Sequence, residues 1–181
     1  MLADRLRATE VESKKRAISG LRTVPWAGPL LDRFREKGGE CPHNRDLMFE
    51  IRFAFELHRA GVTAQYEYRS GVGTSTVDFR VPGDSDWLIE LVSIRPSEAM
   101  KRATHQHGLV YVQELPGDPG DVSQTEKAEV ITARRKIGKK VFTRARRTKL
   151  PDPNAAMYVI VTDMRGYLDQ GAGRHFPGYE V

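Results

Sequence analysis

The pattern of hydrophobic positions predicts a helix between Asn44 and Gly61. Asn44 is expected to cap the start of this helix, and Gly61 is expected to close its end. Apolar side chains recur there at helical spacing, so the helix should bury a broad side. Glu50 falls within that side rather than opposite it. The apolar side is formed by Leu47, Phe49, Phe53, Ala54 and Leu57.

Three runs rich in β-forming residues follow this helix, at residues 63–69, 74–81 and 87–93. The short spacings between them predict an antiparallel meander. A long helix is expected over 124–146, with an apolar stripe that includes Val130, Ile137 and Val141. Residues 157–162 are typical of a buried strand that is parallel to a neighbour, because a helix precedes it. This order predicts an α/β fold around a small mixed sheet.

The flanking segments are organised around this core. Residues 1–18 are expected to form a charged, peripheral helix and 29–37 a short helix, so 1–43 is taken as an N-terminal helical extension of the core at 44–181. An insertion is expected near 94–123, with a short helix over 96–107 and a strand over 109–113. His105 and His107 are assigned to a surface loop, because two histidines without acidic or cysteine partners make a weak metal site.

Positive charge is concentrated in one segment. The net charge is +5, yet the window from Glu126 to Lys149 holds ten basic and two acidic side chains. Such a segment attracts a polyanion, most often nucleic acid, although an ordinary solvated helix face is the alternative. The residues expected to contact nucleic acid are Arg134, Arg135, Lys139, Arg144, Arg146 and Arg147.

Three absences in the sequence predict a cytoplasmic protein without a membrane segment. No apolar run approaches the roughly 18 residues that span a bilayer. The N-terminal stretch has no apolar core of a secretory signal. Cys41 is the only cysteine, which excludes an intrachain disulfide and suits a reducing compartment.

Strand alternation identifies a candidate acidic site. Asp78 lies on the face of its strand opposite Phe79, and Glu90 lies in a strongly apolar strand where an isolated carboxylate is costly. Adjacent strands can bring Asp78 and Glu90 together, and Mg²⁺ or Mn²⁺ would relieve their repulsion while activating a water near a phosphate. Glu50 can add a third carboxylate. The alternative is structural pairing, of Asp78 with Arg80, or of Glu90 with Arg52, Arg80 or Arg95.

The stretch from Phe49 to Ser93 resembles the PD-(D/E)xK, or restriction-endonuclease-like, nuclease superfamily. Glu50, followed by Leu57 and Gly61, looks like the helix motif; Thr76-Val77-Asp78-Phe79 looks like the strand with the metal-binding Asp; and Leu88-Ile89-Glu90-Leu91-Val92 looks like the (D/E)xK strand. The resemblance implies a three-layer core of helix, three-stranded meander, helix and strand.

The resemblance further implies a Mg²⁺-dependent endonuclease that hydrolyses phosphodiester bonds in DNA. Such enzymes act in restriction, repair or defence, often as homodimers. Glu50, Asp78 and Glu90 would be the catalytic and metal-binding acids. The lysine of the motif is missing, because Val92 stands in its place. Lys136 is the first candidate to replace it, Lys140 the second and Arg95 the third. The alternatives are an inactive nucleic-acid-binding or assembly domain on the same fold, and a protein-interaction domain.

Overall fold

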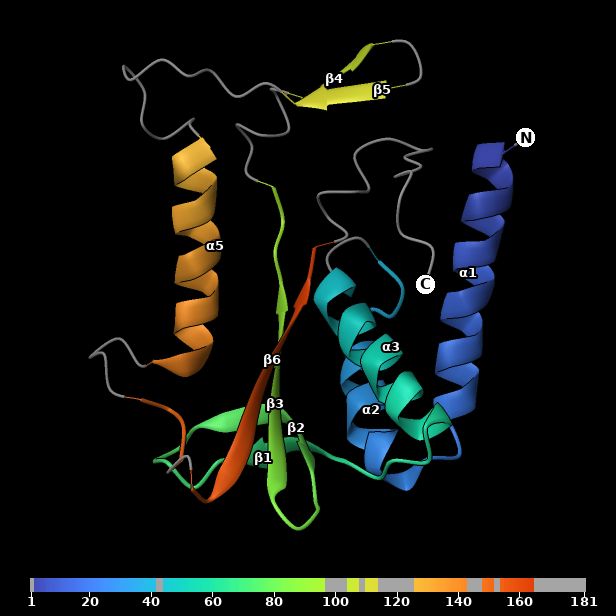
Figure 1. The fold of residues 1–181 in the computed structure, drawn as a ribbon. Coiled ribbons are helices and arrows are strands. Elements are labelled where there is room, and N and C mark those ends of the chain that lie inside the picture. Colours follow the sequence, from blue (N-terminus) through green and yellow to red (C-terminus); the bar gives the residue numbers. More distant parts are fainter. Residues whose placement is uncertain are drawn as a thin grey trace.

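The computed structural model describes residues 2–41, 44–96, 104–107, 110–113, 126–142, 148–151 and 154–164. Figure 1 shows the helices and strands formed by these residues. The helices are α1 (Leu2–Leu21), the 3-10 helix η1 (Pro25–Ala27), α2 (Gly28–Glu36), α3 (Arg45–Arg59) and α5 (Glu126–Val141). The strands are β1 (Gln65–Arg69), β2 (Thr76–Val81), β3 (Asp86–Ser93), β4 (Thr104–His107), β5 (Val110–Gln113) and β6 (Ala156–Asp163).

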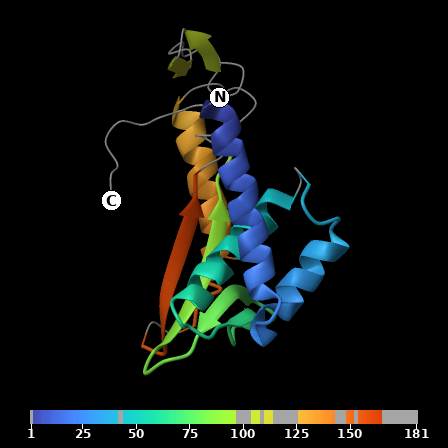
Figure 2. The same ribbon diagram turned by 90° about the vertical axis from the view of Figure 1, so that its right-hand side faces the viewer.

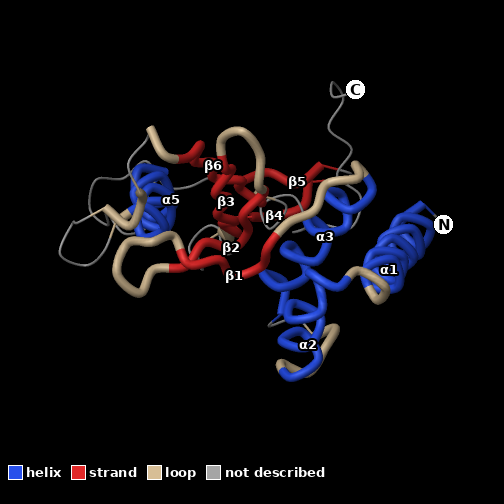
Figure 3. The backbone as a smooth tube through the Cα atoms, turned by 90° about the horizontal axis from the view of Figure 1, so that it is seen from below, coloured by secondary structure: helices blue, strands red, loops and turns tan. Residues whose placement is uncertain are grey.

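A four-stranded mixed sheet lies at the centre, in the order β1-β2-β3-β6. The strands β1, β2 and β3 form an antiparallel meander, and β6 runs parallel to β3, as Figure 2 shows. Helices α1, α2 and α3 lie on one side of the sheet and α5 stands on the other (Figures 1 and 3). The predicted α/β class with a small mixed sheet is therefore confirmed.

The main core lies between the sheet and the helices α1 to α3. Phe79 on β2 is fully buried, and its ring packs against Tyr66, Phe53 and Trp26 with centroid distances of 5.4, 5.5 and 6.4 Å. Burial of such a side chain contributes on the order of 1.5–3 kcal/mol. Because the Phe79 side chain points to the helical side of the sheet, the side chain of its neighbour Asp78 points to the opposite side.

Helices α1 and α2 contribute directly to this core. Ala17 and Leu21 near the end of α1 are 2% and 0% exposed, and Leu30 of α2 is also fully buried. They belong to the same apolar cluster as Ile51 of α3 and Phe79. The charged first half of α1 is exposed from Ala8 to Ser13.

The ends of α3 differ in how they match the sequence pattern. Asn44 precedes the helix, but its amide donates to the carbonyl oxygens of Lys37 and Gly39, at 2.7 and 2.8 Å, and makes no capping bond. The expected cap is therefore wrong, because the amide ties the helix to the preceding loop instead. Gly61 closes the helix as predicted, with a φ of 71° that favours glycine.

Two other expectations are corrected. Thr104–His107 forms β4 rather than part of a helix or a surface loop, because it pairs with β5 in a register that places His105 opposite Val112. The helix α5 ends at Val141 rather than near 146, because Phe142 leaves it to bridge Thr148. Near the start of α5, Val130 is 46% exposed, so the expected apolar stripe is not buried along its whole length.

Within the described helices, none combines the length and apolar character that a bilayer crossing requires.

Candidate active site

The register of β2 and β3 brings two acidic residues together. It pairs Phe79 with Ile89 and Arg80 with Leu88, and one further step places Asp78 opposite Glu90. Asp78 Oδ2 accepts a hydrogen bond of 2.6 Å from the backbone N–H of Leu91, so this carboxylate is held against β3. The two carboxyl groups are close enough for a protonated Glu90 to hydrogen-bond to Asp78.

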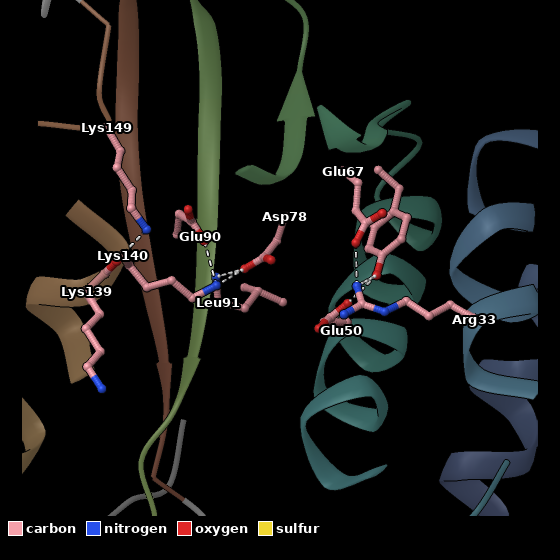
Figure 4. Close-up of polar contacts among 10 residues, drawn as sticks. Arg33, Glu50, Glu67, Asp78, Glu90, Leu91, Lys139, Lys140 and Lys149 are labelled. Atoms are coloured by element: carbon pink, nitrogen blue, oxygen red, sulfur yellow. Dashed lines mark hydrogen bonds and ion pairs between the residues drawn. The ribbon is translucent and has the colours of Figure 1, made fainter. Parts of the chain in front are cut away.

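A lysine from α5, on the side of the sheet opposite helices α1 to α3, contacts both carboxylates. Lys140 on α5 places Nζ 2.7 Å from Glu90 Oε2 and 3.0 Å from Asp78 Oδ2 (Figure 4). The Glu90 side chain is only 5% exposed, that of Asp78 18% and that of Lys140 33%. The three side chains therefore form a partly buried cluster between the sheet and α5. Asp78 and Glu90 are called here the acidic pair, and Lys140 is their cationic partner.

Burial and charge act in opposite directions on this cluster. Burial raises the pKa of Glu90, the hydrogen bond from Lys140 opposes that rise, and the charge of Asp78 adds to it. Burial alone would lower the pKa of Lys140, but the charge of Asp78 and the hydrogen bond to Glu90 outweigh it and raise that pKa. Lys140 is therefore protonated at neutral pH, and Glu90 can take up a proton far more readily than an exposed carboxylate.

Glu50 lies in a neighbouring cluster rather than in contact with the acidic pair. Tyr66 donates a 2.7 Å hydrogen bond to Glu50 Oε2, and Arg33 donates to the Tyr66 hydroxyl at 2.7 Å. Figure 4 shows Arg33 beside Glu50 and Glu67. Burial raises the pKa of Glu50 to about 7, against the hydrogen bond from Tyr66. The charges of Asp78 and Lys140 also act on that pKa, so the two clusters interact electrostatically.

The strand beside Asp78 is distorted. The β1–β2 register pairs Tyr66 with Phe79 and Tyr68 with Val77, which places Glu67 opposite Asp78. Glu67 has a φ of 49°, which is uncommon for a residue with a side chain and costs on the order of 1–2 kcal/mol. Its carboxylate forms an ion pair with Arg33. Backbone strain of this kind often accompanies functional sites.

Of the three candidate replacement cations, Lys140 is the one that contacts the acidic pair. Lys136, the preferred candidate, lies one turn earlier on α5 and makes no hydrogen bond or ion pair to Asp78 or Glu90 in the described residues. Arg95 donates to Asp46 at 2.7 Å. Val92 is 5% exposed and apolar, so the position of the motif lysine carries no charge.

The structural ion pairs proposed as an alternative are formed with other partners. Arg80 pairs with Asp86 at 2.7 Å. Arg52 pairs with Glu10 at 3.0 Å. Neither arginine is paired with the acidic residues of the site, which leaves Lys140 as their cationic partner among the described residues.

The C-terminal end of α5 is fastened to the sheet close to Lys140. Lys149 Nζ donates to the carbonyl oxygen of Lys139 at 2.8 Å, and the Lys149 backbone N–H donates to that of Val141 at 2.8 Å. Ser70, which follows β1, donates to the Lys149 carbonyl at 3.2 Å. A lysine that satisfies terminal carbonyl groups stabilises a helix end. These bonds therefore fix the position of the end of α5, and with it the place on the sheet that Lys140 contacts.

The acidic pair fits a hard divalent cation in its donor chemistry. Within the described part of the chain, no three His, Cys, Asp or Glu side chains converge as a ligand set. Mg²⁺ is commonly bound through one or two carboxylates, with waters and substrate phosphate completing its shell. Asp78 Oδ2 and Glu90 Oε2, which now share the Lys140 ammonium, are the oxygens that would hold it. In the described residues Glu50 forms no three-carboxylate ligand set with them.

The basic residues of α5 are only partly described. Arg134, Arg135 and Lys139 are exposed. Arg144, Arg146 and Arg147, which were also expected to contact nucleic acid, lie outside the described residues.

Sequence reasoning missed the partners that surround the acids. Tyr66, Arg33 and Glu67 were not singled out, because their contacts join helix α2, α3 and strand β1 across the fold. Tyr158 on β6 was also missed, although a tyrosine within the apolar run MYVIVT is a usable signal. A buried tyrosine hydroxyl normally needs a partner, so such a position merits attention.

No protein-family model, curated protein or solved structure matches this chain. The site is therefore defined by the geometry of its own residues: a carboxylate pair on β2 and β3, and a lysine on α5.

Proposed function

We propose that this chain is a metal-dependent nuclease with a restriction-endonuclease-like core, and that it hydrolyses phosphodiester bonds in DNA. The observation that carries the proposal is the contact of the Lys140 ammonium with both Asp78 and Glu90. Two carboxylates and one lysine are the groups that the two motif strands would supply together, with the lysine delivered by α5 instead of position 92. The element order α3-β1-β2-β3-α5-β6, with the β4–β5 pair inserted between β3 and α5, supports the same proposal.

In this proposal Asp78 and Glu90 hold Mg²⁺ or Mn²⁺ through their carboxylate oxygens. When bound, such an ion polarises a phosphoryl oxygen and lowers the pKa of a nearby water. The apolar surroundings of Glu90 exclude competing water, which strengthens each electrostatic contact in the site. The hydrogen bond from the Leu91 N–H to Asp78 Oδ2 would help to orient that carboxylate toward the ion.

Lys140 supplies the positive charge for the transition state. Its ammonium is protonated at neutral pH and reaches the site from the layer opposite the core helices. A preorganised cation that stabilises the charge developing on a phosphate is worth about 10²–10³ in rate. Because Lys140 occupies the same carboxylate oxygens as the proposed ion, it must withdraw from at least one of them when phosphate and ion bind.

The proposed partner is DNA, attracted by the exposed basic residues on α5. Arg134, Arg135 and Lys139 belong to the same helix as Lys140, so a backbone that tracks this helix passes close to the acidic pair. Cutting both strands of a duplex needs two sites, which a homodimer would provide. Restriction, repair and defence are the processes in which such an enzyme would act.

A plasmid-nicking assay tests the proposal. Supercoiled DNA should be nicked with Mg²⁺ or Mn²⁺ and remain intact with EDTA, and Glu90→Gln should abolish nicking. Glu56→Gln, an exposed change on α3, is the matched control and should nick normally. If the unmodified protein binds DNA but never nicks it with either ion, the domain is a nucleic-acid-binding module and the proposal fails.

A further inference from the structure

Tyr158 on β6 has a buried hydroxyl that is left without a hydrogen-bond partner among the described residues. An unsatisfied buried hydroxyl costs about 1–3 kcal/mol, so native structures seldom retain one without a reason. Tyrosine could be replaced by phenylalanine at this position without loss of any described contact. The hydroxyl therefore points to a role in another state of the site.

The register places Tyr158 beside the acidic pair. In the parallel ladder of β3 and β6, Tyr158 lies opposite Leu88, and Ile160 lies opposite Glu90. Since side chains two residues apart share a face, Tyr158 is on the same face of the sheet as Glu90. Burial raises the pKa of Tyr158, and the charges of Glu90 and Asp78 raise it further, so the hydroxyl stays protonated and keeps a hydrogen to donate.

We propose that Tyr158 is a positioning residue for the acidic pair: its hydroxyl donates a hydrogen bond to Glu90 once Lys140 has left that carboxylate. The inference rests on the exchange of Lys140 required by the proposed function. In the present structure Lys140 holds Glu90 at 2.7 Å, so the hydroxyl is not needed. When Lys140 turns to a phosphate, Glu90 loses that donor while it remains buried.

A phenol suits this exchange better than a second cation. It is neutral, so it can orient a carboxylate without cancelling the negative charge that attracts a divalent ion. Donors that orient metal-binding carboxylates typically affect metal affinity or activity by about 10–100-fold. Lys140 and Tyr158 would thus hold Glu90 in turn, the first without the ion and the second with it.

A double-mutant cycle of thermal unfolding tests the exchange without reliance on cleavage. The four proteins are the unmodified chain, Tyr158→Phe, Lys140→Met and the double variant, all without metal. In the unmodified background Tyr158→Phe should leave the melting temperature unchanged or raise it. In the Lys140→Met background it should lower that temperature by about 2–4 °C, because the hydroxyl then holds Glu90. Equal shifts in both backgrounds overturn the inference.

Two additions keep the test decisive. If Lys140→Met does not fold, Lys140→Leu, which also lacks a donor, replaces it in the same cycle. The second readout is the rise in melting temperature with Mg²⁺ alone, for which Tyr158→Phe should need about 10-fold more Mg²⁺ than the unmodified chain. An unchanged Mg²⁺ requirement contradicts a role of Tyr158 in the ion-bound site. Failure of the unmodified chain to respond to Mg²⁺ or to nick DNA counts against the proposed function, while the metal-free cycle still decides the inference.

Discussion

The ammonium nitrogen of Lys140 lies 2.7 Å from Glu90 Oε2, although the two residues are 50 positions apart in the chain. This contact joins the α5 layer to the central strand β3. Taking both charges out of water is unfavourable, and their attraction offsets that cost only while both are present. Removal of either partner therefore leaves a poorly solvated charge, and this has consequences for both stability and activity.

Glu90→Gln should lower the free energy of unfolding by about 1–3 kcal/mol. This is less than the loss typical of a fully buried pair, because the Lys140 side chain remains 33% exposed. Urea unfolding measures the effect. Glu10→Gln, which removes an exposed partner of Lys14 and Arg52, is the control and should cost less than about 1 kcal/mol. Equal losses in the two variants would show that the Glu90 contact is no stronger than a surface pair.

The raised pKa of Glu50 predicts a pH dependence of stability. Its pKa is about 7 in the folded protein against an ordinary 4.5, so the folded state binds a proton in the intervening range that the unfolded chain does not. The resulting stabilisation is complete below pH 4.5 and is lost as the pH rises through about 7. Glu50→Gln, which can still accept from Tyr66, should therefore lose less stability between pH 5 and 8.

The difference should amount to about 1–3 kcal/mol, allowing for the partial exposure of Glu50. Denaturant unfolding at several pH values measures it, and the exposed change Glu56→Gln on the same helix is the control. If the unmodified protein and Glu50→Gln follow the same pH profile, the carboxyl of Glu50 is not buried as described.

Salt dependence tests the nucleic-acid surface of α5. Each phosphate neutralised on duplex DNA contributes a slope of about −0.9 in log K against log salt. Arg135→Glu together with Lys139→Glu should therefore make the slope less steep by the contribution of about two phosphates. Arg59→Glu, an exposed charge reversal on α3, should reduce affinity only through net charge. A slope unaffected by the α5 changes would identify this helix as an ordinary solvated face.

Lys149 provides a test of how α5 is positioned. Lys149→Met removes the ammonium that binds the Lys139 carbonyl oxygen at 2.8 Å and should loosen the end of the helix that carries Lys140. We expect a several-fold fall in kcat with little change in KM, and recovery with Lys149→Arg, which keeps a donor. A fall in kcat that Lys149→Arg does not restore would contradict this positioning role, and a change confined to KM would favour a direct role in DNA binding.

The sequence pattern located the acidic pair because it depends on local periodicity. Alternation along β2 and β3 places Asp78 and Glu90 on one face, and the short turn between the strands fixes their register. The apolar strand around Glu90 also marked that carboxylate as one that needs a partner. These features require no knowledge of distant contacts.

The identity of the partner could not be deduced in the same way. Lys136 and Lys140 both border the apolar stripe of α5. Which of them reaches the acidic pair depends on the position of the helix along its axis relative to the sheet. That position is set by the contacts of Lys149 with the helix end and with Ser70, which join distant segments. The hydrogen bond from Tyr66 to Glu50 is likewise decided by packing of β1 against α3.

The comparison of Lys140→Met with Lys136→Met in Mg²⁺-dependent plasmid nicking tests the central claim most directly. Both changes keep an unbranched side chain of nearly the same length and remove one charge from α5, but only Lys140 contacts the acidic pair in the described structure. We predict that Lys140→Met lowers kcat by about 10²-fold or more while DNA affinity changes little. Lys136→Met should retain nearly full kcat. Full activity of Lys140→Met, or an equal loss in both variants, would contradict the assignment of Lys140 as the cation of the site.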